Sequence, residues 1–226
     1  MRGRYIRAID NGVESLLAAA SDKGWVTSRG VIEDLIKPLQ AVGYELVPTR
    51  PGDPLIAELV PRSREAGRKR SLSALHGRDS FPLHTDGAHI RRAPDYILLE
   101  HATSGSSGTN TLLHRIDAMK LSPSLLGDID HGVFLAANGR ASFLVHARDK
   151  AGRVRFDPGC MRPLDDRARR VASHFLSVAA TAVRHSWSYR GELLVIDNTA
   201  ALHGRSSAPA DDGRVLRRLL IRRSRG

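Results

Sequence analysis

The chain is 226 residues long, 41% of them hydrophobic, and it carries a formal net charge of +11. This length suits one domain with a substantial buried core. The one cysteine, Cys160, excludes an intrachain disulfide and predicts a reducing compartment, with the thiol in a structural or incidental role. No apolar run reaches the roughly 18 residues of a membrane span, and the first residues are polar, so we expect a cytoplasmic protein without a membrane partner.

The positive charge of the chain comes mostly from arginine. A large excess of one sign attracts partners of the opposite sign over long distances, so we expect an anionic partner. An acidic small-molecule substrate, free or bound to a carrier protein, fits this charge. A nucleic acid is disfavoured because aromatic residues make up only 5% of the chain and no nucleic-acid-binding motif is present.

The N-terminal part of the sequence predicts two helices followed by two strands. Residues 10–20 suit a short helix capped by Asp10 or Asn11. Apolar residues at helical spacing predict a second helix over residues 28–41, which Pro38 should end or kink in its last turn. The two strands are expected at 44–48 and 55–60, on either side of the turn-forming segment 51–54.

A basic, polar segment, residues 62–70, follows the N-terminal elements. We interpret it as a solvated loop, and a lid or a docking patch for an anion is the alternative. From residue 71 the pattern becomes that of strands, because residues 71–75 alternate between polar and apolar. The other strands are expected at 95–101, 109–113, 142–148, 154–156 and 193–196, and 142–148 and 154–156 flank a plausible hairpin turn at 149–152.

Two more helices are predicted between these strands. Ser122 at the N-cap and Pro123 at the first helical position predict a short helix over residues 122–129. An apolar stripe predicts the longest helix over residues 165–184. Many short strands with few long helices indicate a mainly antiparallel β sandwich with flanking helices.

Two histidines and one aspartate are candidate metal ligands. His84 and Asp86 are separated by one residue, so on a strand both side chains point to the same face. His203 would complete a two-histidine, one-carboxylate facial triad, which is typical of non-haem Fe(II) oxygenases because it leaves one face of an octahedral ion open. The pair alone also fits a surface turn with a capping carboxylate. His89 is the one rival ligand, but a site without Asp86 would need a loop geometry that we cannot justify.

Two arginines follow His203 near the end of the chain. Arg214 and Arg218 are four positions apart, so on one strand their guanidinium groups share a face. A planar guanidinium matches a carboxylate, and an iron site that chelates 2-oxoglutarate needs an anchor for its far carboxylate. Thr111, on the inner face of an expected strand, can hydrogen-bond a carboxylate, although threonine is also common in strands as a structural residue.

Four segments, in this order, resemble the TauD/TfdA-like (clavaminate-synthase-like) Fe(II)- and 2-oxoglutarate-dependent dioxygenases. They are residues 82–86, 108–112, 191–205 and 214–218. The resemblance implies a double-stranded β-helix, a cupin-like jelly roll, over residues 70–221. Residues 1–60 would brace this core with helices and strands, so that residues 1–226 form a single dioxygenase domain.

The resemblance also implies the cofactors and the reaction. Fe(II) would bind 2-oxoglutarate and O₂, and hydroxylation of a small amino-acid-derived or natural-product substrate would release succinate and CO₂. Desaturation or ring closure stays open, whereas the presence of Asp86 argues against halogenation. The implied iron ligands and catalytic residues are His84, Asp86 and His203. The implied co-substrate residues are Thr111 and Arg214, with Arg218 as a further candidate for co-substrate or substrate.

Several alternatives remain open at this stage. Arg205 and Arg218 could contact a substrate carboxylate, brace the co-substrate or form ion pairs in the sheet. Asp197 and Asn198 should close a tight turn and support His203 through hydrogen bonds. The remaining histidines are expected to be ordinary residues. A non-catalytic jelly-roll binding protein and a basic nucleic-acid-associated oxygenase are the two other functional hypotheses; the presence of all four residues His84, Asp86, His203 and Arg214 counts against the first.

Overall fold

The computed structural model describes residues 6–7, 12–69, 71–137 and 139–225. The helices are α1 (Gly12–Lys23), α2 (Ile32–Ala41), α3 (Leu72–His76), α4 (Pro123–His131) and α5 (Asp166–Ser177), and a short 3-10 helix, η1 (Val178–Thr181), follows α5. The strands are β1 (Ile6–Arg7), β2 (Trp25–Arg29), β3 (Tyr44–Val47), β4 (Ile56–Leu59), β5 (Phe81–His84), β6 (Tyr96–His101), β7 (Thr111–Arg115), β8 (Phe134–Ala137), β9 (Ser142–Val145), β10 (Met161–Pro163), β11 (Val183–His185), β12 (Glu192–Asp197), β13 (Ala201–Arg205) and β14 (Leu216–Arg223).

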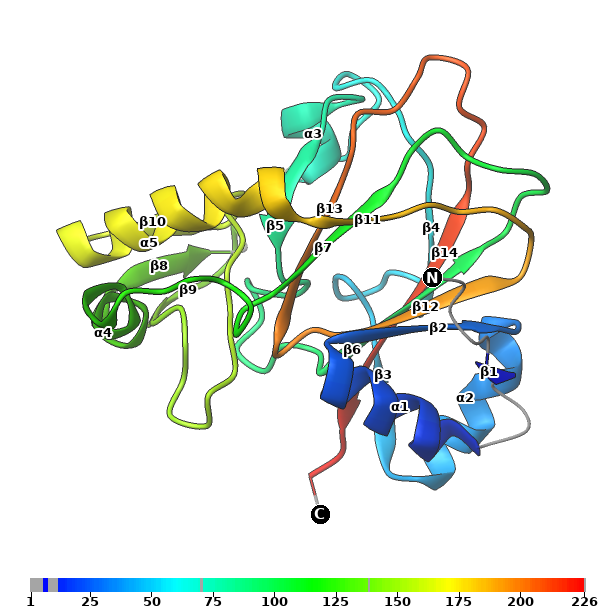
Figure 1. Cartoon of the computed structure of the whole chain (residues 1–226), viewed down its shortest axis with the longest axis horizontal. Coiled ribbons are helices and arrows are strands. Elements are labelled where there is room, and N and C mark those ends of the chain that lie inside the picture. The colour runs from blue at the N-terminus through cyan, green and yellow to red at the C-terminus, as the bar shows by residue number, and fades with distance from the viewer. Residues whose placement is uncertain (1–5, 8–11, 70, 138, 226) are drawn as a thin grey trace.

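The largest sheet has the strand order β1-β2-β12-β6-β14-β3, and β4 also pairs with β14. All its pairings are antiparallel except that between β1 and β2. Helices α1 and α2 lie against one face of this sheet (Figure 1) and bury apolar residues of β6, β12 and β14 with their own. The N-terminal part of the chain thus contributes the strands β2, β3 and β4 to the large sheet itself.

A second sheet, of four strands in the order β11-β7-β13-β5, lies opposite the large one. A buried apolar cluster joins the two, with Leu113 and Trp187 from the smaller-sheet side and Ile97, Ile196 and Leu220 from the large sheet. Side chains alternate between the two faces of a strand. Thr111 and Leu113 therefore share the inner face of β7, and His203 shares the inner face of β13 with Ala201.

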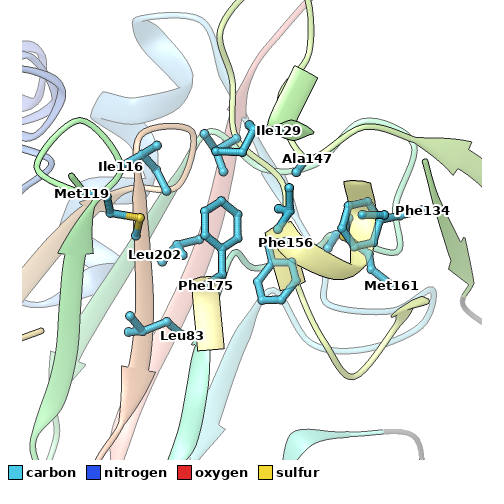
Figure 2. Close-up of a cluster of buried hydrophobic side chains, with 14 of the residues drawn as sticks. Leu83, Ile116, Met119, Ile129, Phe134, Ala147, Phe156, Met161, Phe175 and Leu202 are labelled. Atoms are coloured by element: carbon cyan, nitrogen blue, oxygen red, sulfur yellow. The ribbon is translucent and has the colours of Figure 1, made fainter. Parts of the chain in front are cut away.

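The outer face of the second sheet is covered by a third layer. It consists of α4, α5 and a small sheet of order β10-β8-β9. Figure 2 shows Phe156 and Phe175 between Leu202 of β13 and the residues Phe134 and Met161 of this layer. All five side chains are buried. These side chains pack against the outer face of the second sheet, so the residues of the site lie on its inner face.

Two facing antiparallel sheets with helices outside them confirm the predicted fold class, a mainly β jelly roll with flanking helices. The predicted strands at 44–48, 55–60, 95–101 and 193–196 are present as β3, β4, β6 and β12. The helix at Ser122 is also confirmed, because the Ser122 hydroxyl accepts a hydrogen bond from the backbone N–H of Leu125 at 3.2 Å. No helix within the described ranges is long and apolar enough to cross a membrane.

The predicted boundaries of the early helices need correction. The helix expected from residue 28 begins at Ile32, because Trp25–Arg29 forms strand β2 and pairs with β12. Pro38 lies inside α2, which ends at Ala41, and the N–H of Val42 donates to the Pro38 carbonyl at 3.2 Å. The proposed caps Asp10 and Asn11 lie outside the described residues.

Three later predictions were also wrong in part. Residues 71–75, expected as a strand, instead provide the cap and most of helix α3 (Leu72–His76), because the Ser71 hydroxyl caps its first turn by accepting from the N–H of Ala74 at 3.2 Å. The long helix expected over 165–184 ends at Ser177, and Val183–His185 instead pairs with β7 as β11. The hairpin expected over 142–156 is reduced to one bridge, because β9 pairs with β8, a strand that was not predicted.

Candidate metal and co-substrate site

Three potential metal ligands meet at one end of the second sheet. His84 is the last residue of β5, Asp86 follows two positions later, and His203 of β13 pairs directly with His84. Their ligand atoms lie within 4.8 Å of one another, and all three residues are buried. Within the described ranges, this is the group of three His, Cys, Asp or Glu residues that could hold a metal ion.

The two imidazoles are suited to donate lone pairs. Nδ1 of His84 lies 2.9 Å from the Pro82 carbonyl. Because a carbonyl can only accept, this nitrogen carries the proton and Nε2 is left as the neutral donor atom. Burial lowers the pKa of His203 to about 3. His203 is therefore neutral near pH 7 and can bind a cation without first losing a proton.

Asp86 carries the negative charge of the group. Burial alone would raise the pKa of Asp86, but the Arg218 guanidinium holds it below its usual value. One nitrogen of Arg218 lies 2.9 Å from each Asp86 carboxylate oxygen, and the other donates to the Thr49 hydroxyl at 2.6 Å. The carboxylate therefore stays ionised, and Thr49 joins a site to which the sequence did not assign it.

The backbone around Asp86 is clamped by residues far away in the sequence. The side-chain amide of Asn198 accepts from the Asp86 N–H at 2.8 Å and donates to the Asp86 carbonyl at 2.9 Å. The peptide groups of Thr85 and Phe156 are also joined, by a 2.6 Å hydrogen bond from the Thr85 N–H. Asn198 was expected to support His203, and the structure shows that it instead holds Asp86.

Arg214 is a buried cation with few partners. Its guanidinium donates to the Thr109 carbonyl at 3.2 Å, and its Nε is buried without a hydrogen-bond partner in the described part of the chain. Burial lowers the pKa of Arg214 to about 10, which leaves it charged near pH 7. Arg214 precedes β14, so the prediction that it shares this strand with Arg218 was wrong.

Thr111, the other predicted co-substrate residue, is the first residue of β7 and is buried. It lies two positions from Thr109, whose carbonyl binds Arg214. Its hydroxyl accepts a hydrogen bond from the indole N–H of Trp187 at 3.0 Å. Trp187 was not predicted as part of the site, because it and Thr111 come from segments that meet only in the folded sheet.

The other candidates from the sequence have different surroundings. The Arg205 guanidinium donates to the carbonyls of Gly77, at 2.8 Å, and Asp79, and covers the Phe81 ring at 3.9 Å, so it braces the chain before β5. His89 is half-buried and is not part of the three-residue group. Residues 62–69 of the basic segment form a loop with two ion pairs, Arg64 with Asp79 and Arg68 with Asp53.

Burial raises the pKa of the Cys160 thiol well above its usual value. A thiol that stays protonated is a poor nucleophile. This agrees with the structural role expected for the single cysteine.

Comparison with known proteins identifies relatives by fold alone. No protein-family model matches the sequence, and no curated protein does. Among solved structures, asparagine oxygenase in complex with Fe(II), 2S,3S-3-hydroxyasparagine and succinate superposes with a TM-score of 0.72 and 18% identity, covering 92% of this chain and 77% of that one. The non-heme iron oxygenase OrfP, with Fe, succinate and (3S)-hydroxy-L-Arg, has a TM-score of 0.69 and 20% identity over 92% of this chain and 76% of that one.

A third similar structure is that of PvcB, an Fe, alpha-ketoglutarate dependent oxygenase from an isonitrile synthetic pathway. It superposes with a TM-score of 0.68 and 18% identity, over 98% of this chain and 85% of the other. At these identities the likeness establishes a shared fold. This chain therefore shares its jelly-roll fold with these three iron oxygenases, as the resemblance in the sequence implied.

Proposed function

We propose that this protein is an Fe(II)- and 2-oxoglutarate-dependent oxygenase that hydroxylates a small, amino-acid-derived substrate. The observation that carries this proposal is the convergence of His84, Asp86 and His203 on one point, with ligand atoms within 4.8 Å. Two imidazoles and one carboxylate on a single face are the donor set of non-haem Fe(II) oxygenases.

The residues present fit an iron ion. His84 offers Nε2, His203 is kept neutral by burial, and Arg218 keeps Asp86 ionised, so no ligand has to lose a proton. When bound, the iron together with 2-oxoglutarate and O₂ would supply the oxidising chemistry that hydroxylates the substrate and releases succinate and CO₂. Asn198 and Thr85 would hold the metal-binding loop rigid, which favours binding without rearrangement.

We assign the far carboxylate of 2-oxoglutarate to Arg214 and Thr111. A buried guanidinium that has one carbonyl partner has donors to spare, and a carboxylate is the ligand that matches its geometry. Arg218 is better suited to keeping Asp86 ionised, because its two terminal nitrogens already bind Asp86 and Thr49 at the metal side.

The substrate proposal is supported by the chemistry of the similar structures. Two of them were solved with hydroxylated amino acids, and the third belongs to an isonitrile pathway. The charge of +11 favours an anionic substrate, either free or bound to an acidic carrier. The single cysteine supports a reducing, cytoplasmic location.

Anaerobic titration tests the proposal directly. The metal-free protein is titrated with Fe(II) and then with 2-oxoglutarate, and the visible charge-transfer band of the chelate is followed. We expect the band to saturate at one iron per chain, and succinate release to identify substrates in a panel of amino acids and their derivatives. If no band forms, the enzyme assignment is wrong and a binding role for the jelly roll takes its place.

A further inference from the structure

Trp187 lies directly behind the proposed co-substrate subsite. The residue follows β11 and is fully buried between the two sheets. Its indole N–H donates to the Thr111 hydroxyl at 3.0 Å, across 76 positions of sequence. A tryptophan buried in an apolar core needs one partner for this N–H, and here the partner is a residue proposed to bind a ligand.

The direction of this hydrogen bond determines what the Thr111 hydroxyl can do. An indole can only donate, whereas a hydroxyl has one proton and two acceptor lone pairs. The bond from Trp187 occupies one lone pair and leaves the Thr111 proton available. A carboxylate can only accept, so the hydroxyl is prepared for a ligand of this kind.

The surroundings of Trp187 hold its ring in place. The rings of His101 and His185 pack against it, one tilted and one edge-on, with centroids 5.8 and 4.5 Å from that of the indole. The carbonyl of Trp187 accepts from the N–H of Ser107 at 3.0 Å. Ser107 in turn bonds the Asp212 carboxylate at 3.1 Å, and Asp212 also accepts from the backbone N–H of Arg214. Trp187 is therefore connected to Thr111 through its indole and to Arg214 through its backbone carbonyl.

We propose that Trp187 is a positioning residue for 2-oxo-acid recognition: through its hydrogen bond it turns the Thr111 hydroxyl into a donor for the carboxylate at the far end of the co-substrate. This inference rests on the proposed function. It assigns to Trp187 an effect on the far carboxylate and no effect on the metal or on the keto-acid end.

The test compares two ligands in the wild type and in Trp187→Phe, which keeps an aromatic ring but lacks the N–H. 2-Oxoglutarate carries the far carboxylate, and 2-oxopentanoate has the same chain length and keto-acid end without it. Both dissociation constants are measured anaerobically with Fe(II)-loaded protein. We expect Trp187→Phe to bind 2-oxoglutarate about three- to tenfold more weakly, the range of one lost neutral hydrogen bond, with unchanged 2-oxopentanoate and iron binding.

Two further variants control for general loosening of the core. Trp25→Phe makes the same change at the other tryptophan, which packs against the same buried cluster. It should leave the preference for 2-oxoglutarate over 2-oxopentanoate unchanged. In a Thr111→Val background, Trp187→Phe should cause no additional loss, because the hydroxyl that it orients is gone. If Trp187→Phe does not fold, benzothienylalanine incorporated into the Trp25→Phe protein replaces the N–H of Trp187 by sulfur within the same ring shape.

Each outcome separates the inference from the proposed function. If the wild type binds neither keto acid at the iron, the proposed function fails and the inference fails with it. If the wild type binds 2-oxoglutarate and the Trp187 variant binds both ligands normally, or weakens both equally, only the inference is overturned. A loss in Thr111→Val that adds fully to the loss in Trp187→Phe would also overturn it.

Discussion

The proposed site has two ends, one with the metal ligands and one with Arg214, and charged groups are compensated differently at each. At the metal end, Asp86 is matched by Arg218, and the neighbouring His203 stays neutral because burial lowers its pKa to about 3. At the other end, the Arg214 guanidinium is buried against one carbonyl. A buried cation with unfilled donors is costly even with the Asp212 carboxylate nearby, and proteins keep such cations where a ligand completes their hydrogen bonds. The difference indicates that the first end is built for a cation and the second for an anion.

Removal of a metal ligand should have the largest effect. His203→Ala or His84→Ala leaves two donor atoms, and we expect iron binding and turnover to be abolished. Iron content after anaerobic loading and succinate release measure this. His131→Ala, at the exposed end of α4, is the matched control and should retain both. A His203 variant that is active and fully loaded with iron would remove this residue from the site.

Arg214→Ala tests the anion end. We expect 2-oxoglutarate to bind more weakly by about 2–5 kcal/mol, because its carboxylate would be buried without a partner, while iron binding stays intact. The dissociation constant from the charge-transfer band reports this change. Arg218→Ala is the comparison, since its guanidinium faces Asp86. If Arg214→Ala leaves the affinity unchanged and Arg218→Ala lowers it, the two arginines exchange their assignments.

Asn198→Leu tests how far the metal end depends on its backbone clamp. The substitution removes both hydrogen bonds to the Asp86 peptide and a third, at 2.9 Å, to the Pro94 carbonyl. We expect iron affinity to fall by about 10–100-fold, the range seen when partners that orient metal ligands are lost. Competition with a metal chelator measures the change. Binding of iron with wild-type affinity would show that Thr85 and Phe156 hold the loop without Asn198.

The sequence predicts the metal ligands of this site better than it predicts the residues that position the ligands through hydrogen bonds. His84, Asp86 and His203 were predicted from the His-x-Asp spacing together with the family resemblance, although Asp86 lies in the turn after β5 and not on the strand itself. Asn198 was assigned to the wrong partner because its direction depends on a contact across 112 positions. Trp187 carried no signal, since its partner Thr111 lies on a strand that it meets only after folding.

The errors in the fold have similar causes. Five residues, Leu72–His76, are too few to distinguish the period of a strand from that of a helix, and the Ser71 cap decides the outcome. The apolar pattern of α5 continues as far as Ala182, but pairing with β7 places Val183–His185 in the sheet. Strand β2 shows no regular alternation of buried and exposed residues, and its place in the sheet depends on pairing with β12, a strand far away in the sequence.

His185, which lies against the Trp187 ring behind the anion end, gives the smallest predicted effect and one that depends on pH. Burial, with the charge of His101, lowers the pKa of His185 from 6.5 to about 4. Glu192 approaches to 3.6 Å, but burial outweighs it, so the contact is not an ion pair at pH 7. Because the unfolded chain takes up a proton at about pH 6.5 and the folded one only near pH 4, the unfolded state binds more protons between these values.

The contribution of His185 to stability is therefore complete above about pH 6.5 and decreases as the pH falls toward 4, by at most about 1.4 kcal/mol per pH unit. His185→Gln should reduce the slope of unfolding free energy against pH in this window, as measured by denaturant titration at several pH values. The slope that remains belongs to other buried groups, above all His203 at the metal end. An unchanged slope would mean that His185 is already protonated in the folded protein, with Glu192 as its counterion, so that the core behind the anion end would hold a charge pair in place of a neutral ring.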